Sequence, residues 1–357
     1  MNLYQIGWNE IFEKSFEPYY SQGYSAGRVI AEHKNIYKVF TEYGEILAEI
    51  SGKMRFQAEE QGDFPAVGDW VVLSIRSSER SATIHAILPR KSKFSRKTAG
   101  VLTKEQIVAS NVDSVFLVTS LNNDFNLRRL ERYLILAWES GANPVIVLSK
   151  SDLCEDLEDK LSQIESIAIG VPVHAVSSFS GAGISELEQY MSTGSTIALM
   201  GSSGVGKSTL INHLIGNEVM KTKEVREGDD RGRHTSSHRE IFMLANGSLI
   251  IDTPGMREIQ LWDGNEGIAE AFEDIEELSK KCSFSDCRHE KEPGCAVRQA
   301  ILDGSLAEER YESYKKLQKE IEHIERRQQA VMRKENRKAQ KKAVNAPRDK
   351  SYKRMYE

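Results

Sequence analysis

The chain has few cysteines, few prolines and no long apolar run. Only four of its 357 residues are cysteine and eight are proline, which excludes a secreted disulfide scaffold and a collagen-like or low-complexity chain. No segment approaches the roughly 18 consecutive apolar residues that a membrane span requires. The N-terminal sequence MNLYQIGWNEIFEKSFE lacks the basic and apolar regions of a signal peptide. We therefore expect a cytoplasmic protein without membrane contact.

Lys and Arg are concentrated near the C-terminus. The net charge is −5, yet residues 326–354 hold twelve Lys and Arg and only two Asp and Glu. The rest of the chain is therefore acidic. A basic tail on an acidic body indicates a polyanionic partner, most often nucleic acid, although a solvated helix end has the same composition.

The N-terminal part of the sequence predicts a small barrel. After an extension over 1–22, residues 23–95 contain five short segments rich in β-branched and aromatic residues, separated by glycines. This spacing predicts a five-stranded OB-like barrel, a fold that often binds oligonucleotides, with an SH3-like barrel as the alternative. The basic segment PRKSKFSRKTAG then runs into a linker over 96–111, which either contacts phosphates or forms an exposed loop.

The central and C-terminal parts predict two further units. Residues 112–262 alternate apolar strand-like runs with helical patterns, which indicates a doubly wound α/β domain with a mostly parallel sheet. Residues 263–342 are expected to be helical and to carry a Cys/His cluster, and 343–357 form a basic tail. We therefore expect a multi-domain fold, with barrel, α/β domain and helical region in that order.

The segment GSSGVGKS at Gly201–Ser208 matches the phosphate-binding motif G-x-x-x-x-G-K-[ST]. Glycines let the backbone wrap tightly and turn N–H groups towards phosphate, and the following helix adds the partial positive charge of its N-terminus. Lys207 is expected to reach the β- and γ-phosphates, and Ser208 to ligate Mg²⁺. The predicted nucleotide-binding residues here are Gly201, Ser202, Ser203, Gly204, Val205, Gly206, Lys207, Ser208 and Thr209.

Two later segments are spaced as the γ-phosphate and metal elements of a nucleotide hydrolase. DTPG, about 45 residues after the P-loop, places Asp252 to hold the metal through water and the Gly255 N–H to meet the γ-phosphate. Between them, Thr235 in RGRHTSSHR is expected to complete the Mg²⁺ shell. A polar loop of this kind is ordered by γ-phosphate and metal.

A carboxylate that reads guanine is expected in SKSD, which follows the apolar run PVIVL. Guanine offers N1–H and N2–H as paired donors to one Asp, whereas adenine does not. Taken alone, SKSD is better explained as an N-cap for a helix over 155–168, through Ser151 or Asp152, but the full set of motifs favours base recognition. The next element is the loop after PVHAV, and the predicted base-recognition residues are Ser149, Lys150, Ser151, Asp152, Ser177 and Ser178.

The order SKSD, VSS, GSSGVGKS, GRHTS, DTPG is a circular permutation of the usual GTPase order. With the preceding barrel, PAVGDWV and the later Cys/His cluster, the chain resembles the bacterial ribosome small-subunit-dependent GTPase A family over essentially its whole length. The resemblance implies binding of GTP and GDP with Mg²⁺, turnover stimulated by the small ribosomal subunit and its rRNA, and a role in late maturation of that subunit. Ser149 stands where that family more usually has Asn or Thr, and Ser178 where Ala is more usual.

The residue that activates water is not given by the usual position. Met256 follows Gly255 where many GTPases have a Gln that orients the attacking water. His234, adjacent to the metal-binding Thr235, is our candidate, in agreement with the resemblance. Arg233 and His238 are alternatives, and an exposed loop residue without a role is another interpretation of His234.

Three cysteines and one histidine are clustered as C-x4-C-x-H-x5-C, at Cys282, Cys287, His289 and Cys295. Three thiolates and an imidazole form a closed tetrahedral Zn²⁺ site, and a closed ligand set indicates a structural role. Free cysteines or a disulfide are the alternatives.

The function predicted from the sequence is GTP hydrolysis linked to the small ribosomal subunit, by a monomer. Two other interpretations are an RNA-binding P-loop ATPase and an RNA-binding module with a vestigial nucleotide site. The intact Lys207, Ser208, Thr235 and Asp252 argue against the vestigial site.

Overall fold

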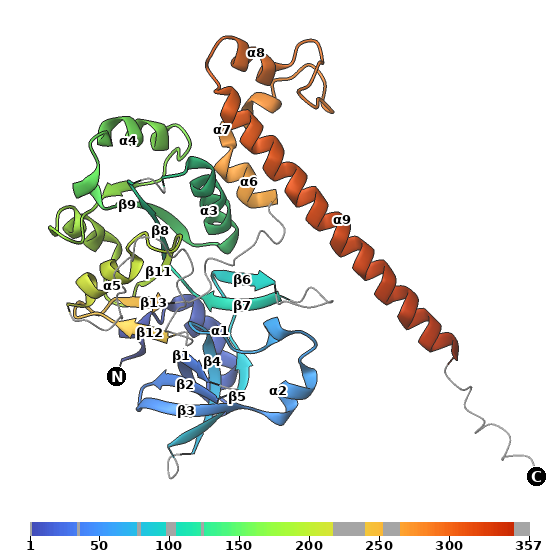
Figure 1. Ribbon diagram of the computed structural model, residues 1–357. Helices are drawn as coiled ribbons and strands as arrows, with labels where there is room; N and C mark the ends of the chain where they lie inside the picture. The colour runs from blue at the N-terminus through green and yellow to red at the C-terminus, as the bar shows by residue number, and fades with distance from the viewer. Residues whose placement is uncertain are drawn as a thin grey trace, which may run out of the picture.

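The computed structural model describes residues 2–33, 36–76, 80–97, 105–122, 125–216, 240–252 and 265–345. Figure 1 shows a barrel, an α/β region above it and a helical region at the far end, from which one long helix projects. No helix in the described parts of the chain is long and apolar enough to cross a membrane.

The barrel is a closed ring of five strands in the order β1-β2-β3-β5-β4, with β4 returning to β1. All neighbours in this ring are antiparallel except β3 and β5, which are parallel. A closed five-stranded ring removes the exposed edges of the sheet and agrees with the OB-like prediction. Its strands are β1 (Ser25–His33), β2 (Ile36–Thr41), β3 (Gly44–Ile50), β4 (Trp70–Arg76) and β5 (Ser81–Ile87).

Aromatic side chains attach the N-terminal extension to the barrel. Helix α1 (Glu10–Tyr20) begins at Asn9, whose side chain accepts hydrogen bonds from two backbone N–H groups of the first turn. Phe12 and Phe16 on α1 are buried, and Trp8 lies with its ring centroid 4.7 Å from that of Trp70 on β4. A short 3-10 helix, η1 (Leu3–Ile6), precedes α1, while α2 (Gly52–Gln57) and η2 (Gln61–Asp63) connect β3 to β4.

The segment predicted as a basic linker contains structure of its own. Strands β6 (Lys93–Lys97) and β7 (Glu105–Ser110) pair antiparallel and form a separate two-stranded sheet. Phe94 on β6 is buried in the main core. Arg90 donates to both oxygens of the buried Asp69, at 2.7 and 2.6 Å. Arg90 and Phe94 therefore have partners within the chain, whereas the sequence pattern left a phosphate contact and an exposed loop open for this segment.

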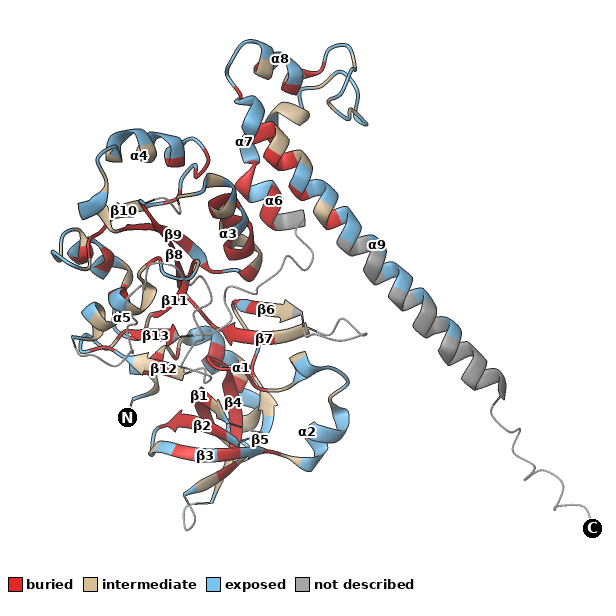
Figure 2. Ribbon diagram, in the orientation of Figure 1, coloured by how far each residue is buried: buried red, intermediate tan, exposed pale blue. Residues whose placement is uncertain are grey.

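The α/β domain has six strands in the order β10-β9-β8-β11-β13-β12. Five of them are parallel, and β12 runs antiparallel to β13. Figure 2 shows β8, β9 and β11 almost wholly buried, whereas β10 and most of β12 are only partly buried. The strands are β8 (Ser114–Ser120), β9 (Asn143–Ser149), β10 (Val173–Ala175), β11 (Thr196–Met200), β12 (Glu240–Met243) and β13 (Leu249–Asp252).

Both faces of this sheet carry apolar side chains, as a doubly wound sheet requires. Val115 and Leu117 of β8 belong to one core cluster, and Phe116 and Val118 belong to another. This separation follows from the two-residue period of a strand. The connecting elements are α3 (Leu127–Ser140), η3 (Ser151–Leu153), α4 (Leu157–Glu165), η4 (Ile184–Tyr190) and α5 (Lys207–Ile215).

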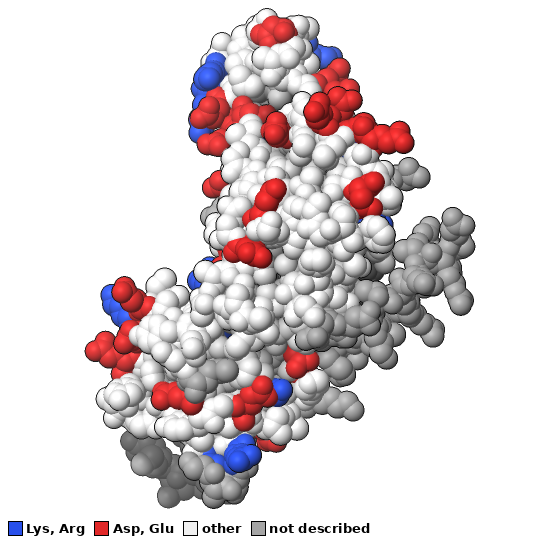
Figure 3. Space-filling view, turned by 90° about the vertical axis from the view of Figure 1, so that its left-hand side faces the viewer, with Lys and Arg blue, Asp and Glu red and all other residues white. Residues whose placement is uncertain are grey.

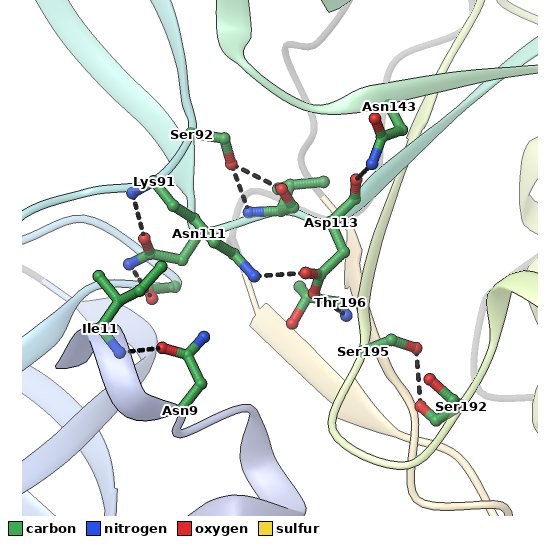
Figure 4. Close-up of polar contacts among 12 residues, drawn as sticks. Asn9, Ile11, Lys91, Ser92, Asn111, Asp113, Asn143, Ser192, Ser195 and Thr196 are labelled. Carbon is green, nitrogen blue, oxygen red and sulfur yellow. Dashed lines mark hydrogen bonds and ion pairs between the residues drawn. The ribbon is translucent and has the colours of Figure 1, made fainter. Parts of the chain in front are cut away.

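Polar contacts join the segment that follows the barrel to the start of the α/β domain, as Figure 4 shows for Lys91, Ser92, Asn111 and Asp113. Asp113 accepts from the backbone N–H of Thr196 at 2.8 Å, which ties the start of β8 to the start of β11. Lys91 pairs with the same carboxylate. The fully buried Arg28 donates to the carbonyl oxygens of Ile6, Gly68 and Asn111, and burial lowers its pKa to about 10.

The helical region consists of α6 (Asn265–Ala271), α7 (Glu273–Ser279), α8 (Ala296–Leu302) and α9 (Glu308–Asn345). The beginning of α9 is anchored by the buried residues Tyr311, Tyr314, Leu317 and Ile321. Beyond them α9 extends away from the rest of the structure (Figure 1). The observed helices agree with the helical C-terminal region expected from the sequence.

Candidate nucleotide and metal sites

The order of the strands predicts where a ligand binds. The chain passes from β8 outward to β9 and β10, then returns to β11 on the other side of β8. In open α/β sheets, ligands bind beyond the carboxyl ends of the strands at such a reversal. The P-loop follows β11, and SKSD follows β9. The topology therefore brings these two predicted motifs to the same edge of the sheet.

The P-loop has the backbone geometry that its glycines permit. Gly206, directly before α5, has φ 97°, in the left-handed region that favours glycine. A Cβ on Gly201 would lie 2.3 Å from the carbonyl oxygen of Val118, so no larger residue fits against β8 there. Lys207, the first residue of α5, directs its Nζ back over the loop to the carbonyl oxygens of Gly201 at 2.8 Å and Ser202 at 2.6 Å.

The first two residues of SKSD pack on this loop. Ser149 donates its hydroxyl to the carbonyl oxygen of Val205 at 2.5 Å, and Lys150 donates its Nζ to that of Gly204 at 2.9 Å. Lys150 has φ 60°, an uncommon backbone conformation for a residue other than glycine. Strain of this kind is found chiefly where function requires a particular orientation.

The geometry does not support SKSD as a simple helix cap. Helix α4 begins after Asp156, five residues beyond the Ser151 that was the alternative cap, and its N-cap side chain makes no capping bond. Asp152 lies in the short helix η3 and is exposed. Its carboxylate is therefore accessible to a ligand at the strand ends.

The predicted base loop lies beside SKSD. The Ser151 N–H donates to the carbonyl oxygen of Val176 at 3.1 Å, which holds the two loops together. Ser177 is buried, and its hydroxyl accepts from the Ser180 N–H at 3.2 Å. Ser178 is partly exposed next to it.

Several predicted residues lie outside the described part of the chain. These residues are Arg233, His234, Thr235, His238, Gly255 and Met256. The backbone of Asp252 ends β13, parallel to β11, as expected for the start of DTPG. Ser208 and Thr209 are the second and third residues of α5, and Ser203 is exposed on the loop.

The cysteines and histidine predicted to bind zinc do converge. The ligand atoms of Cys282, Cys287, His289 and Cys295 all lie within 4.8 Å of one another. The Cys282 sulfur is 3.9 Å from that of Cys295 and 3.5 Å from Nδ1 of His289. Tetrahedral zinc with usual bond lengths requires separations of about 3.8 Å between two sulfurs and about 3.6 Å between sulfur and nitrogen. The donor set therefore fits zinc.

Neighbouring groups orient these ligands. Nε2 of His289 lies 3.1 Å from the Ser279 hydroxyl, which directs Nδ1 towards the sulfurs. The Cys295 sulfur accepts from the Arg298 N–H at the start of α8. Tyr311 of α9 donates to the His289 carbonyl oxygen at 3.1 Å. The cluster thus links the loop, α8 and α9.

The sequence reasoning missed the contribution of α3 to the P-loop. Arg129 of this helix donates from Nη1 to the Ser202 hydroxyl at 2.5 Å. The sequence did predict the buried strand before α3. If that strand neighbours the strand before the P-loop, the start of α3 has to lie near the P-loop. The identity of that neighbour is a tertiary property that the sequence pattern did not give.

Comparison with known proteins agrees with this arrangement. The chain is 47% identical over 303 residues to "Small ribosomal subunit biogenesis GTPase RsgA 2" of Lactiplantibacillus plantarum, covering 84% of each protein. The chain belongs to the RsgA GTPase family. An RsgA protein of Opitutus terrae is 42% identical over 357 residues, covering 98% of this chain and 97% of that protein. The family model described as RsgA GTPase matches residues 87–262.

Solved structures support the same fold. The crystal structure of YjeQ from Thermotoga maritima has a TM-score of 0.63 and 30% identity, covering 84% of this chain and 98% of that one. YloQ, described as a circularly permuted GTPase, has a TM-score of 0.60 and 26% identity, covering 84% and 96%. A second family model, described as a 50S ribosome-binding GTPase, matches residues 196–336. This match begins at β11, where the P-loop half of the domain starts.

These findings confirm several predictions from the sequence. The fold is an OB-like barrel, a circularly permuted P-loop GTPase domain and a C-terminal region with a Cys/His cluster. The activity of this RsgA-family protein is that of a GTPase, which overrules the ATPase and vestigial-site alternatives. Its family implies GTP, GDP and Mg²⁺ as ligands.

Proposed function

We propose that this RsgA-family GTPase hydrolyses GTP while bound to the small ribosomal subunit, assists late maturation of that subunit and is stimulated by it. The main support for this proposal is the packing of Ser149 and Lys150 on the P-loop carbonyl oxygens. This packing supports the proposal that the guanine-reading motif and the phosphate-binding motif belong to one site. Relatives named as small ribosomal subunit biogenesis GTPases supply the partner.

Each predicted nucleotide residue has a proposed role. The loop from Gly201 to Ser208 holds the phosphates through its backbone N–H groups, with Lys207 directed at the β- and γ-phosphates. Asp152 accepts the two guanine donors, and the backbone N–H of Ser178 contacts the base oxygen. Asp252 and Gly255 meet the metal and the γ-phosphate.

Ser208 and Thr235 would hold Mg²⁺, and Ser208 at the start of α5 is suitably placed beside Lys207. The ion would neutralise charge on the β- and γ-phosphates. Because Met256 cannot orient water, we assign that task to His234. Hydrolysis by the protein alone is then slow, at about 10⁻⁴–10⁻² s⁻¹, the range of intrinsic GTPases.

The barrel and the basic end of the chain are proposed to contact rRNA. Carboxylates predominate over Lys and Arg among the charged residues on the face in Figure 3, so this face is unsuited to a phosphate backbone. On α9, by contrast, Arg326, Arg333 and Arg337 are exposed on the part of the helix that leaves the body. We therefore assign the barrel, α9 and the tail to the polyanion, and not the acidic patches in Figure 3.

We propose that Cys282, Cys287, His289 and Cys295 hold one structural Zn²⁺ per chain. The support is the fit of the sulfur and nitrogen separations to a tetrahedral site. We also propose that the protein works as a monomer in the cytoplasm, where ribosomal subunits are assembled.

The test of this proposal is GTP and ATP turnover, with and without purified small ribosomal subunits. We expect hydrolysis of GTP but not of ATP, and a rate that rises when subunits are added. Equal turnover of both nucleotides would refute the assignment of SKSD, and a rate unchanged by subunits would refute the proposed partner.

The variant Asp152→Asn tests the base contact separately. The amide inverts one hydrogen bond to the base, so affinity for GTP is expected to fall and affinity for xanthosine triphosphate to rise. Glu155→Gln, an exposed carboxylate three residues along, is the control. An unchanged nucleotide preference in Asp152→Asn would show that Asp152 does not read the base.

A further inference from the structure

The N-terminal turn of α3 lies next to the P-loop because β8 and β11 are neighbouring parallel strands. Helix α3 follows β8 and the P-loop follows β11, so both begin at the same edge of the sheet. Asn126 fixes this end of α3, since its side chain accepts from the Arg129 N–H at 2.9 Å. The start of the helix is therefore held in place beside the loop.

Two side chains of α3 face Ser202. The guanidinium of Arg129 donates to the Ser202 hydroxyl at 2.5 Å, and the Tyr133 hydroxyl lies 3.4 Å from the same oxygen. Arg129 and Tyr133 are four residues apart and share one helix face. Arg128 is exposed, and Arg132 pairs with Glu320 of α9, so these two arginines do not serve the loop.

Lys207 contacts the same residue through its backbone carbonyl. Its Nζ contacts the carbonyl oxygen of Ser202 at 2.6 Å, while Arg129 contacts the Ser202 side chain. The direction of Lys207 therefore depends on where the Ser202 peptide lies. A hydrogen bond from a charged donor is roughly twice as strong as one between neutral groups.

We propose that Arg129 is a positioning residue of the GTPase site, which holds the Ser202 peptide and thereby aims Lys207 at the phosphates. This inference rests on the proposed nucleotide site. Lys207 stabilises the negative charge that develops as the γ-phosphate is transferred. A small displacement of such a group affects the transition state more than the bound ground state. Loss of Arg129 is expected to act mainly on kcat.

The experiment measures kcat and KM for GTP hydrolysis by the full chain with Mg²⁺ and without ribosomal subunits. Arg129→Ala is expected to lower kcat about tenfold, because misplacement of a catalytic group costs up to roughly 10²-fold, while KM for GTP changes less than threefold. Arg129→Lys retains a charged donor and is expected to recover part of the rate. Arg128→Ala, the neighbouring exposed arginine, is the control and is expected to match the wild type.

A double-mutant cycle with Ser202→Ala tests the route of the effect. If Arg129 acts through Ser202, then Ser202→Ala lowers kcat by a similar factor and the double variant is no slower than either single variant. Fully additive losses, or an unchanged kcat in Arg129→Ala and Ser202→Ala, would overturn the proposal. A fall in thermal stability with a normal kcat would also overturn the proposal, because loss of a merely structural contact has that effect.

A failure of this inference can be distinguished from a failure of the proposed function. Intrinsic turnover does not require the ribosomal subunit, so a failed stimulation by subunits leaves the effect of Arg129 measurable. If Arg129→Ala does not fold, Ser202→Ala and Arg129→Lys still decide the question. A wild-type protein without GTP turnover would instead refute the nucleotide site itself.

Discussion

Replacement of Arg310 by Met tests how the GTPase domain holds the C-terminal helices. Arg310 of α9 donates to both carboxylate oxygens of Asp274 at 2.7 Å and to the carbonyl oxygen of Ala271 at 3.0 Å. It also lies 3.5 Å from Glu131 of α3. Arg310 is 7% exposed and Glu131 is 3% exposed. This arginine therefore joins α3, α6, α7 and α9 from within the interface.

The expected loss can be derived from this burial. Removal of one partner of a buried ion pair costs about 3–5 kcal/mol, because it leaves the other charge desolvated. Glu131 would keep one hydrogen bond, from Ser313 at 2.6 Å. At about 1.4 kcal/mol per tenfold change, amides of 265–322 should exchange with solvent roughly two to three and a half orders of magnitude faster in Arg310→Met. Hydrogen exchange measured by mass spectrometry on the full chain provides this measurement.

The pH dependence supplies an independent check. Burial raises the pKa of Glu131, and the hydrogen bond from Ser313 and the charge of Arg310 oppose that rise. Without Arg310 the pKa rises further. A folded-state pKa above the unfolded value of about 4.3 means that stability is greatest at low pH and is lost as pH rises through the folded pKa. Arg310→Met should therefore regain stability as the pH is lowered from 7 towards 5.

Two further variants make this prediction refutable. Adding Glu131→Gln to Arg310→Met removes the deeply buried unpaired charge, although not that of the partly exposed Asp274, and is expected to restore part of the protection. Arg326→Met on the same helix breaks an exposed pair with Glu322, and exposed pairs contribute only about 0–1 kcal/mol. If Arg310→Met exchanges no faster than Arg326→Met, the interface does not depend on the buried pair and the reasoning fails.

Two other predictions concern the metal and the catalytic residue. Elemental analysis should find one zinc per chain, and Cys287→Ser should lose it and expose α8 to proteolysis, since structural zinc binding is largely folding free energy; protein without zinc, or Cys287→Ser that stays protease-resistant, would contradict the site. His234→Ala should lower subunit-stimulated GTP turnover about 10²-fold or more, with GTP affinity and subunit binding nearly unchanged. Full stimulated turnover in His234→Ala would move the catalytic role to Arg233, His238 or the ribosome, whereas Thr235→Ala is expected to weaken metal-dependent GTP binding.

Local patterns in the sequence determined much of the fold. The P-loop, SKSD and the Cys/His spacing each combine a few residues at fixed separations, and such motifs specify backbone geometry and chemistry over short distances. Strand and helix patterns likewise gave the barrel, the parallel sheet and the long C-terminal helix, because side-chain periodicity reflects which face is buried. The circular permutation could also be inferred from the order of the motifs, since the strands of a sheet keep their neighbours when only the connections between them change.

The tertiary structure alone decided which side chains meet across elements. The pattern of α3 marks Leu130 and Leu134 as buried, but it does not show that Glu131 is buried too, because its partner Arg310 lies 179 residues along the chain. The basic residues Arg90 and Lys91 suggested a phosphate contact, yet carboxylates distant in sequence pair with them. Arg129 reaches Ser202 only because β8 and β11 are neighbours. A sequence motif specifies its own chemistry, whereas the partner of a charge depends on strand order and helix packing, which a single sequence encodes only through the fold as a whole.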